Sequence, residues 1–385
     1  MVEFYFEHPV KVYSGEGVTA KYLKNVLKDY GKNVMLCFGK GSVKKNGVYD
    51  EIINILSEAG KTVIEFSGIM PNPTYKKVQE GANLAKENKI DLVLAVGGGS
   101  VVDCCKILCA QAVTDEDVWD MWFVKKQKPK KYLPLISVVT VFGTGAEMNA
   151  GGVITNEDKK QKACIYGAFS DFAFLDIKYS MSAPLLQVMS GAFDTFSHCM
   201  EIYFAYPTDN NASDYMNEGA MRCIIDCMRK VKVNPNDKEA RSDLAWISAM
   251  AENGVLKLGK ESAFQAHQIE HQLGAYTDCN HGLGLAVISP SMYLKIYRGG
   301  LQKFKSFAVN VWGVKDNGDD EETARLGILA LRDFIKEVGL PLSLREIGIT
   351  DKSNFREIAN SVNIKKGCFT TLTHEDILEI LEEVF

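Results

Sequence analysis

Five residues in the second half of the chain have the types and the spacing of a metal site. Asp194 and His198 are four residues apart, and so are His267 and His271, with His281 following shortly after. In a helix this spacing puts both side chains on one face, where a carboxylate and an imidazole can bind one cation. Such ligands suit Fe(II) or Zn(II) better than Mg(II) or Ca(II). The sequence therefore predicts a transition-metal site, and the spacing leaves open whether His267 or His271 is a ligand.

The segment His267 to His271 also permits a different enzyme class. It reads His-Gln-Ile-Glu-His and fits H-x-x-E-H, the signature of inverted zinc metallopeptidases, with Glu270 as the general base. A peptidase would have no use for the two glycine loops in the first half of the chain. A peptidase is therefore an alternative rather than the main prediction.

Two glycine loops follow apolar, strand-like runs. Asp91 to Val96 leads into Gly97-Gly98-Gly99-Ser100 and then a helix-like segment, and Leu133 to Thr140 leads into Phe142 to Glu147. Glycine lets the backbone approach a ligand closely, and the first N–H groups of a following helix attract an anion such as pyrophosphate. Two loops of this kind indicate a dinucleotide site. Neither has the G-x-G-x-x-G pattern of an ordinary Rossmann dehydrogenase. In the segment after the first loop, Asp103 and Lys106 are one turn apart, and we expect them to contact further ligand hydroxyls or phosphates.

The elements that must position these residues change character along the chain. Up to about residue 180, short β-branched or aromatic runs alternate with segments of helical period, which is typical of a doubly wound α/β domain with a parallel sheet. After Ser182-Ala183-Pro184 the chain is rich in helix-forming residues to its end. We expect an α/β dinucleotide-binding domain at 1–182, an all-α metal-binding and catalytic domain at 183–385, and an active site in the cleft between them. The expected strands are Asn33–Phe38, Thr62–Phe66, Asp91–Val96, Leu133–Thr140 and Phe172–Leu175.

Composition excludes several classes of protein. The 385 residues carry a net charge of −5 and form no basic stripe that could bind nucleic acid. The longest apolar runs fall short of the roughly 18 to 20 residues that cross a bilayer. The ten cysteines show no zinc-ribbon spacing, and the chain opens without a basic or apolar leader. We expect a cytoplasmic protein with reduced thiols.

Several motifs together identify the chain as similar to a known family. They are Pro71-Asn72-Pro73-Thr74, GGGSVVDCCK at 97–106, TVFGTGAEMN at 140–149, the helix with Asp194 and His198, and H-x-x-x-H followed by His281. The chain resembles the iron-containing, or group III, alcohol dehydrogenases over nearly its whole length, and looks closest to the butanol dehydrogenase and aldehyde reductase branch. Val141, Phe142 and Ala146 depart from the common form of the second loop.

The resemblance implies a role for each matching position. It implies that the metal ligands are Asp194, His198, His267 and His281, which leaves His271 as a proton-relay residue. The dinucleotide contacts that it implies are Asn72, Gly98, Gly99, Ser100, Asp103, Thr140, Thr144 and Lys162. It also implies a homo-oligomer, most simply a dimer.

The loop Gly39-Lys40-Gly41-Ser42 bears on cofactor choice. In NAD-using enzymes an acidic side chain at this place accepts hydrogen bonds from the ribose hydroxyls. Aligned with the family, Lys40 falls where NAD-preferring members carry Asp. Lys40 and Ser42 can instead bind a 2′-phosphate. We therefore expect NADP(H) to be favoured over NAD(H).

The function that follows is the interconversion of small primary alcohols, such as butanol, and aldehydes. A metal with an open coordination position polarises an aldehyde oxygen while a nicotinamide delivers hydride. Four protein ligands would close a tetrahedral zinc site, so we expect Fe(II), with Zn(II) as the alternative. A non-redox lyase of dehydroquinate-synthase-like architecture is a further alternative.

Overall fold

The computed structural model describes residues 2–366 and 368–385, and the chain divides into two compact units. One unit is His8–Pro184, and the other combines Leu185–Phe385 with the first residues of the chain, up to Glu7. The boundary after Pro184 lies two residues beyond the expected boundary after residue 182. The residues up to Glu7 were expected in the α/β domain and belong instead to the helical unit. A backbone hydrogen bond from the Val2 N–H to the Gly259 carbonyl oxygen (3.3 Å) ties the start of the chain to the helical unit.

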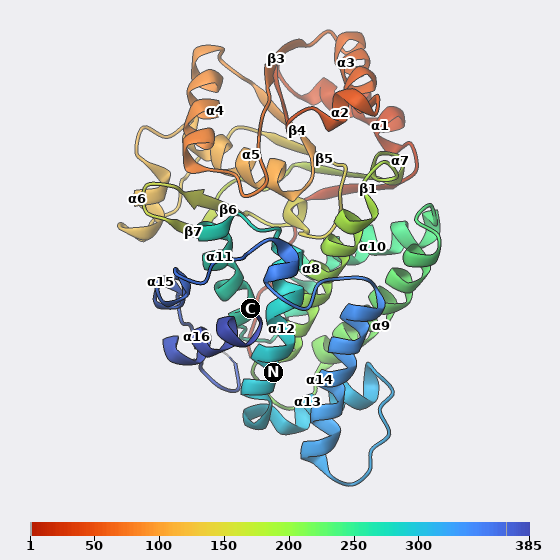
Figure 1. The fold of residues 1–385 in the computed structure, drawn as a ribbon. Coiled ribbons are helices and arrows are strands. Elements are labelled where there is room, and N and C mark those ends of the chain that lie inside the picture. The colour runs from red at the N-terminus through yellow and green to blue at the C-terminus, as the bar shows by residue number, and fades with distance from the viewer. Residues whose placement is uncertain (1, 367) are drawn as a thin grey trace. The chain divides into compact units, whose positions relative to one another are not determined.

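The first unit is built on a six-stranded sheet in which every strand pair is parallel (Figure 1). In spatial order the strands are β1 (Lys11–Gly15), β8 (Phe172–Asp176), β5 (Leu135–Val139), β4 (Leu92–Gly97), β2 (Asn33–Phe38) and β3 (Thr62–Phe66). The helices of this unit are α1 (Val18–Val26), α2 (Ser42–Lys45), α3 (Val48–Glu58), α4 (Tyr75–Glu87), α5 (Gly99–Gln111), α6 (Val118–Phe123) and α7 (Ile177–Ser180), with a 3-10 turn at Leu27–Asp29. The expected doubly wound α/β fold is confirmed.

Alternating side chains of the strands fill two separate cores. In β2, Val34, Leu36 and Phe38 pack with helices α1 and α3, whereas Met35 and Cys37 pack with α4 and α5. A strand that is covered on both faces needs apolar residues at consecutive positions, which is why this segment reads as a continuous apolar run. Because all strands are parallel, their carboxyl ends and the loops that follow them lie along one edge of the sheet.

Three strands were not expected. The edge strand β1 is short and half exposed, so its sequence has no apolar run. The antiparallel hairpin of β6 (Gly151–Asn156) and β7 (Gln161–Tyr166) stands apart from the main sheet. Two glycines begin β6, and glycine is a poor strand former, so the local sequence carries a weak signal there.

The second unit is helical, as expected. Its α-helices are α8 (Leu185–Tyr203), α9 (Ala212–Val233), α10 (Lys238–Glu252), α11 (Gln265–Thr277), α12 (His281–Ile296), α13 (Leu301–Asn310), α14 (Asp320–Glu337), α15 (Phe355–Ser361) and α16 (His374–Glu383). Its 3-10 turns are Val255–Lys257, Tyr297–Gly300 and Arg345–Ile347.

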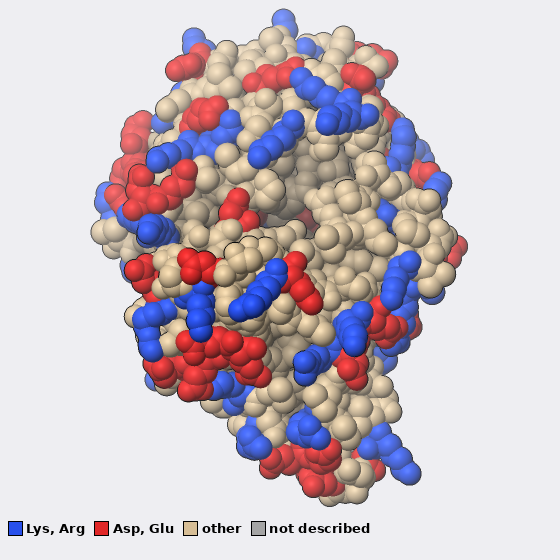
Figure 2. Space-filling view, viewed as in Figure 1, with Lys and Arg blue, Asp and Glu red and all other residues tan. Residues whose placement is uncertain are grey.

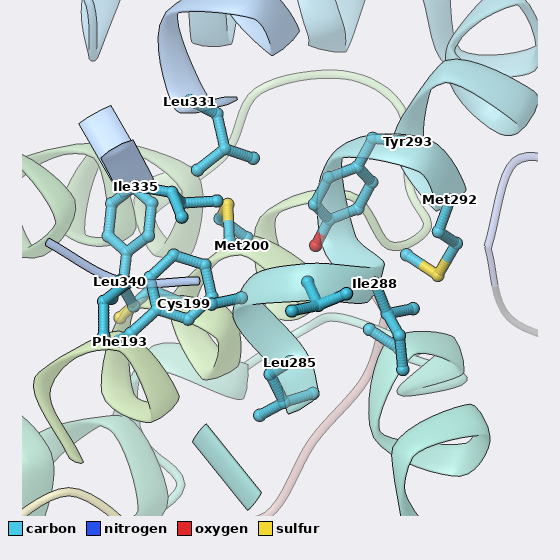
Figure 3. Close-up of a cluster of buried hydrophobic side chains, with 14 of the residues drawn as sticks. Phe193, Cys199, Met200, Leu285, Ile288, Met292, Tyr293, Leu331, Ile335 and Leu340 are labelled. Atoms are coloured by element: carbon cyan, nitrogen blue, oxygen red, sulfur yellow. The ribbon is translucent and has the colours of Figure 1, made fainter. Parts of the chain in front are cut away.

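One apolar core joins these helices (Figure 3). Phe193 and Met200 of α8 lie in it with Leu285 and Ile288 of α12 and Leu331 of α14. Helices α8 and α12 are buried along almost their whole length. Polar side chains on these two helices are therefore held in fixed positions inside the protein.

On the face drawn in Figure 2, Lys and Arg side chains are scattered among Asp and Glu side chains. Within the described part of the chain, none of the helices combines the length and the apolar character that a membrane span requires.

Candidate functional site

Helix α8 carries three functional side chains on one face. Asp194, His198 and Glu201 follow one another at spacings of four and three residues, so they line up along the helix. All three are buried. A buried carboxylate needs a partner of opposite charge or a hydrogen-bond donor, because removing the charge from water without one costs roughly several kcal/mol of stability. The partners here are histidines from α11 and from the start of α12.

The imidazoles converge on one carboxylate oxygen. Asp194 Oδ1 lies 3.3 Å from His267 Nε2, 3.6 Å from His198 Nε2 and 3.6 Å from His281 Nε2. Two ligand atoms bound to one tetrahedral ion at about 2.1 Å each lie roughly 3.4 Å apart. Asp194, His267 and His281 each bring one ligand atom within 4.8 Å of the other two, a group whose types and spacing suit a divalent transition metal, and His198 Nε2 faces the same Asp194 oxygen.

A second carboxylate lies behind each imidazole. The carboxylate of Glu201 contacts His267 Nδ1, and that of Glu270 contacts His281 Nδ1. Glu252 Oε1 lies 3.9 Å from His198 Nδ1, too far for a hydrogen bond, and among the described residues this buried nitrogen has no hydrogen-bond partner. Carboxylates in this position fix the tautomer and the ring orientation of metal-binding histidines.

The positions of Glu201, Glu252 and Glu270 behind the imidazoles were not predicted from the sequence. The sequence does contain a sign of the role of Glu201, because its spacing from Asp194 puts both side chains on the same face of α8. Glu270 was considered only as the base of a peptidase. It has no exposed surface and contacts the far nitrogen of His281, so its position does not fit activation of water for peptide hydrolysis.

The ends of α11 and α12 hold the histidines in place. The carboxylate of Glu201 accepts hydrogen bonds from the backbone N–H groups of Ala266 (2.7 Å) and His267 (3.3 Å). It thereby caps the N-terminus of α11, where N–H groups lack helical partners. Asn280 caps α12 by accepting from the Leu283 N–H (3.1 Å), which sets His281 at the first position of that helix.

The charges around the cluster favour a cation. Burial by itself raises the pKa of Asp194, but His198, His281 and His267 outweigh burial and hold it well below its usual value. Burial lowers the pKa of His267, but Glu201 and Asp194 reverse this effect and raise it to about 10. Burial lowers the pKa of His198. The carboxylates of Glu201 and Asp194 thus favour positive charge at His267.

His271 lies beside the cluster. Its ring centroid is 5.5 Å from that of His281 and 6.2 Å from that of His267. The potential ligand atoms of His271 group with those of Glu270 and His281, whereas His267 groups with Asp194 and His281. Of the two histidines left open by their spacing, His267 is the one that faces Asp194.

The two glycine loops meet at the carboxyl edge of the sheet. Gly98 precedes the first turn of α5, which contains Gly99 and Ser100. A Cβ atom on Gly99 would lie 2.1 Å from Thr144 Oγ1, and one on Gly98 would lie 3.4 Å from Val141 Cβ. Only glycine fits at position 99. The N-terminus of α5 and the second loop therefore form one continuous surface.

Lys106 has a different role from the expected one. Its Nζ is buried and donates to Asn149 Oδ1 (2.9 Å) and to the Gly151 carbonyl oxygen (2.6 Å), and it lies 3.5 Å from Asp103 Oδ1. Asp103 Oδ2 accepts from the Val153 N–H (3.1 Å). Lys106 therefore joins α5 to the second loop and to the hairpin, so the expectation that it contacts a ligand is wrong.

The remaining expected cofactor residues lie on neighbouring loops of the same unit. Thr140 follows β5, and its N–H donates to the Gly97 carbonyl oxygen (2.9 Å). Asn72 has a positive φ of 50° in the loop before α4. That loop is joined to the hairpin by a hydrogen bond from the Thr155 N–H to the Pro73 carbonyl oxygen (2.9 Å), and Lys162 pairs with Thr155 in the hairpin.

The loop after β2 presents a basic residue to solvent. Gly39 follows the strand, and Lys40 and Ser42 are exposed. Lys44 Nζ is 2.9 Å from Glu65 Oε2 on β3, so this lysine already has an acidic partner.

Two family models together match most of the chain. The model described as iron-containing alcohol dehydrogenase matches residues 9–177. The model described as the C-terminal part of the Fe-containing alcohol dehydrogenase family matches residues 188–385.

Similar proteins align along nearly the whole chain. NADH-dependent butanol dehydrogenase A of Clostridium acetobutylicum is 36% identical over 395 residues, which cover 100% of both chains. NADPH-dependent aldehyde reductase YqhD of Escherichia coli is 31% identical over 358 residues, covering 92% of this chain and 91% of its own. The crystal structure of NADH-dependent butanol dehydrogenase A from Thermotoga maritima superposes with a TM-score of 0.94 at 35% identity, covering 100% of this chain and 99% of that one.

Proposed function

Because this chain belongs to the iron-containing alcohol dehydrogenase family, it interconverts alcohols and aldehydes, and we propose that small primary alcohols such as butanol are its substrates. The substrate proposal is supported by relatives that are named butanol dehydrogenases and by one that is named an aldehyde reductase. The reaction needs a nicotinamide cofactor as the hydride carrier. The names of both relatives include such a cofactor, NADH in one and NADPH in the other.

The observation that carries the proposal is the convergence of three imidazole nitrogens on Asp194. We propose that Asp194, His198, His267 and His281 hold Fe(II), with Zn(II) as a possible substitute. The 3.3–3.6 Å separations of the three Nε2 atoms from Asp194 Oδ1 support this ligand set. The carboxylates behind His267 and His281 support it further, because each contacts Nδ1 and so leaves Nε2, the nitrogen that faces Asp194, for the metal.

Side chains of the helical unit position the proposed metal ligands for aldehyde reduction. When bound, the metal supplies Lewis acidity toward the carbonyl oxygen, and the nicotinamide supplies hydride. Glu201 and Glu270 hold the imidazole rings of His267 and His281 in fixed orientations. The Phe264 ring packs edge-on against His267, with centroids 5.3 Å apart, and limits the access of water to that imidazole.

We propose that His271 moves the proton that the reaction consumes. Reduction of an aldehyde to an alcohol takes up one proton in addition to hydride. His271 is beside the proposed ligands and is not among the side chains that face Asp194. An imidazole nitrogen can hold and release a proton near neutral pH.

We propose that Gly98, Gly99 and Ser100, together with Thr140 and Thr144, contact the dinucleotide, and that Asn72, Asp103 and Lys162 complete its site. The N-terminus of α5 supports binding of the pyrophosphate there, because its free N–H groups favour an anion. The absence of a side chain at Gly99 lets Thr144 of the second loop pack against this N-terminus, so residues of both loops are available to one ligand.

We propose that NADPH is preferred over NADH. The segment from Phe38 to Gly47 contains no acidic residue that could accept hydrogen bonds from ribose hydroxyls. Lys40 and Ser42 are exposed there and can donate to a 2′-phosphate, with Gly39 allowing the backbone to come close. One of the two relatives above is named NADH-dependent and the other NADPH-dependent, so the preference of this chain needs a direct test.

Metal removal tests the function. Protein dialysed against a chelator should lose butanal-dependent oxidation of reduced nicotinamide and regain it when Fe(II) is added without oxygen. His198→Ala should lower the bound metal, measured by elemental analysis independently of activity. Full activity without metal would contradict the mechanism, and restoration by Zn(II) alone would contradict the assignment of iron.

The homodimer and the cytoplasmic location stay predictions.

A further inference from the structure

A second group of potential metal ligands lies on helices α9 and α10, outside the histidine cluster. Cys223 and Cys227 are four residues apart on α9, and Asp243 is on α10. One ligand atom from each of the three residues lies within 4.8 Å of the other two. None of the three has a role in the proposed dehydrogenase reaction. We propose that Cys223, Cys227 and Asp243 form a second metal site, selective for a soft divalent cation such as Zn(II) or Cd(II).

The distances match a tetrahedral ion. The two sulfur atoms are 4.0 Å apart, and Cys227 Sγ is 4.0 Å from Asp243 Oδ2. Two thiolates at about 2.3 Å from one tetrahedral zinc ion lie roughly 3.8 Å apart, and a thiolate and a carboxylate oxygen lie roughly 3.5 Å apart. Small side-chain shifts therefore bring all three atoms to bonding distance. A disulfide requires the sulfur atoms to approach to about 2.05 Å, which demands a much larger movement.

The backbone under the site is held in place without a metal. The turn between α9 and α10 is closed by Asp237, whose carboxylate caps α10 by accepting from the Ala240 N–H (3.0 Å). Arg241 Nε donates to the Pro235 carbonyl oxygen in the same turn (2.8 Å). The two helices are thus already packed at the spacing that the three ligands need. Ligand atoms on rigid elements lose less conformational freedom when an ion binds.

The surroundings give the ion access and select its type. Cys227 is buried, Cys223 is half buried and Asp243 is exposed, so the group opens to solvent on one side. Burial raises the pKa of both thiols, that of Cys227 to about 12, so an ion must displace their protons when it binds. Soft cations form strong enough bonds to sulfur to do so, whereas Mg(II) and Ca(II) prefer oxygen ligands.

The two metal sites differ in the chemistry of their ligands. The histidine cluster offers imidazole nitrogens and one carboxylate oxygen, with no sulfur among the described residues that converge on Asp194. The α9–α10 group offers two thiolates. A sulfur-to-metal charge-transfer band therefore excludes the histidine cluster as its source, and the cysteine substitutions below assign it to Cys223 and Cys227.

Cd(II) titration of the iron-loaded, full-length protein tests the proposal. In oxygen-free buffer, we expect a near-ultraviolet charge-transfer band that saturates at one Cd(II) per chain, with a dissociation constant below about 1 μM. Cys227→Ser or Cys223→Ser should abolish the band. Asp243→Asn, at an exposed position that tolerates substitution, should weaken binding by about tenfold or more. Cd(II) should raise the unfolding temperature of the parent protein and leave that of Cys227→Ser unchanged, because the ion links α9 to α10.

A matched control separates this site from adventitious thiol binding. Cys164 is an exposed cysteine on β7, so the Cys164→Ser protein should titrate as the parent does. Any of three results would overturn the proposal: no band with the parent protein, a band that survives both cysteine substitutions, or saturation only at millimolar Cd(II). Unchanged affinity in Asp243→Asn would overturn the assignment of the carboxylate.

Discussion

Replacing Glu201 with glutamine should weaken metal binding without removing any proposed ligand. The substitution keeps the shape of the side chain and removes the negative charge that faces His267 Nδ1. Loss of a carboxylate behind a metal-binding histidine typically lowers affinity by about 10- to 100-fold. This range corresponds to about 1.4–2.7 kcal/mol of binding free energy.

Two other effects of Glu201→Gln must be separated from this loss. The parent carboxylate accepts backbone hydrogen bonds from Ala266 (2.7 Å) and His267 (3.3 Å). A glutamine has one acceptor oxygen, so one N–H loses its partner and the fold loses about 1–3 kcal/mol of stability. The substitution also lowers the pKa of His267, so a proton competes less with the metal. The metal carries twice the charge of the proton, so the net effect is still weaker metal binding.

The assay is competition with a chelator of graded concentration, read by elemental analysis, at two pH values between 7 and 9. Glu218→Gln is the matched control, because Glu218 is also a buried glutamate and is bonded to Tyr203 (2.7 Å) and Asn310 (2.9 Å) instead of a histidine. The control should retain the parent affinity. If Glu201→Gln binds metal within about threefold of the parent at both pH values, the proposed role of the carboxylate is wrong.

Four further predictions concern single side chains. His271→Ala should keep its metal while turnover falls by roughly 10², and metal loss there combined with metal retention in His267→Ala would show that the two roles are reversed. The pKa of His267 is about 10, so near pH 8 a metal ion must displace a proton from this histidine when it binds. The metal affinity should therefore rise with pH up to about 10. The number of protons released is measured by calorimetry in buffers of different ionisation enthalpy. Lys40→Asp should raise the KM for NADPH and spare NADH, and an unchanged preference would contradict the role of this loop. Lys106→Met removes the donor to the Gly151 carbonyl oxygen and one of the two donors to Asn149 Oδ1, and it leaves the Asp103 carboxylate without its cation. Urea unfolding should therefore show a loss of about 3–5 kcal/mol, and the KM for the cofactor should rise. An unchanged KM would contradict the link to the second loop.

Local patterns in the sequence were sufficient for the main elements. The strands Asn33–Phe38 and Thr62–Phe66 were predicted at their observed bounds. Asn33–Phe38 is covered on both faces and reads as an apolar run. Thr62–Phe66 is a partly exposed edge strand, and its β-branched and aromatic residues marked it. The four-residue spacing of Asp194 and His198 predicted one side of the proposed metal site from local geometry as well. Helical geometry alone puts such a pair on one face.

The partners of those residues depended on the tertiary structure. Glu201 and His267 are 66 residues apart in sequence, and their contact exists because α8 packs beside the start of α11. Lys106 was expected at a ligand, yet it is 45 residues from Gly151, the hairpin residue whose carbonyl it binds. The sequence by itself determined which side chains share a face of a helix or follow a strand, because those relations repeat with the period of the backbone. Only the tertiary structure decided which faces meet, because contacts between distant segments depend on how whole helices and strands pack.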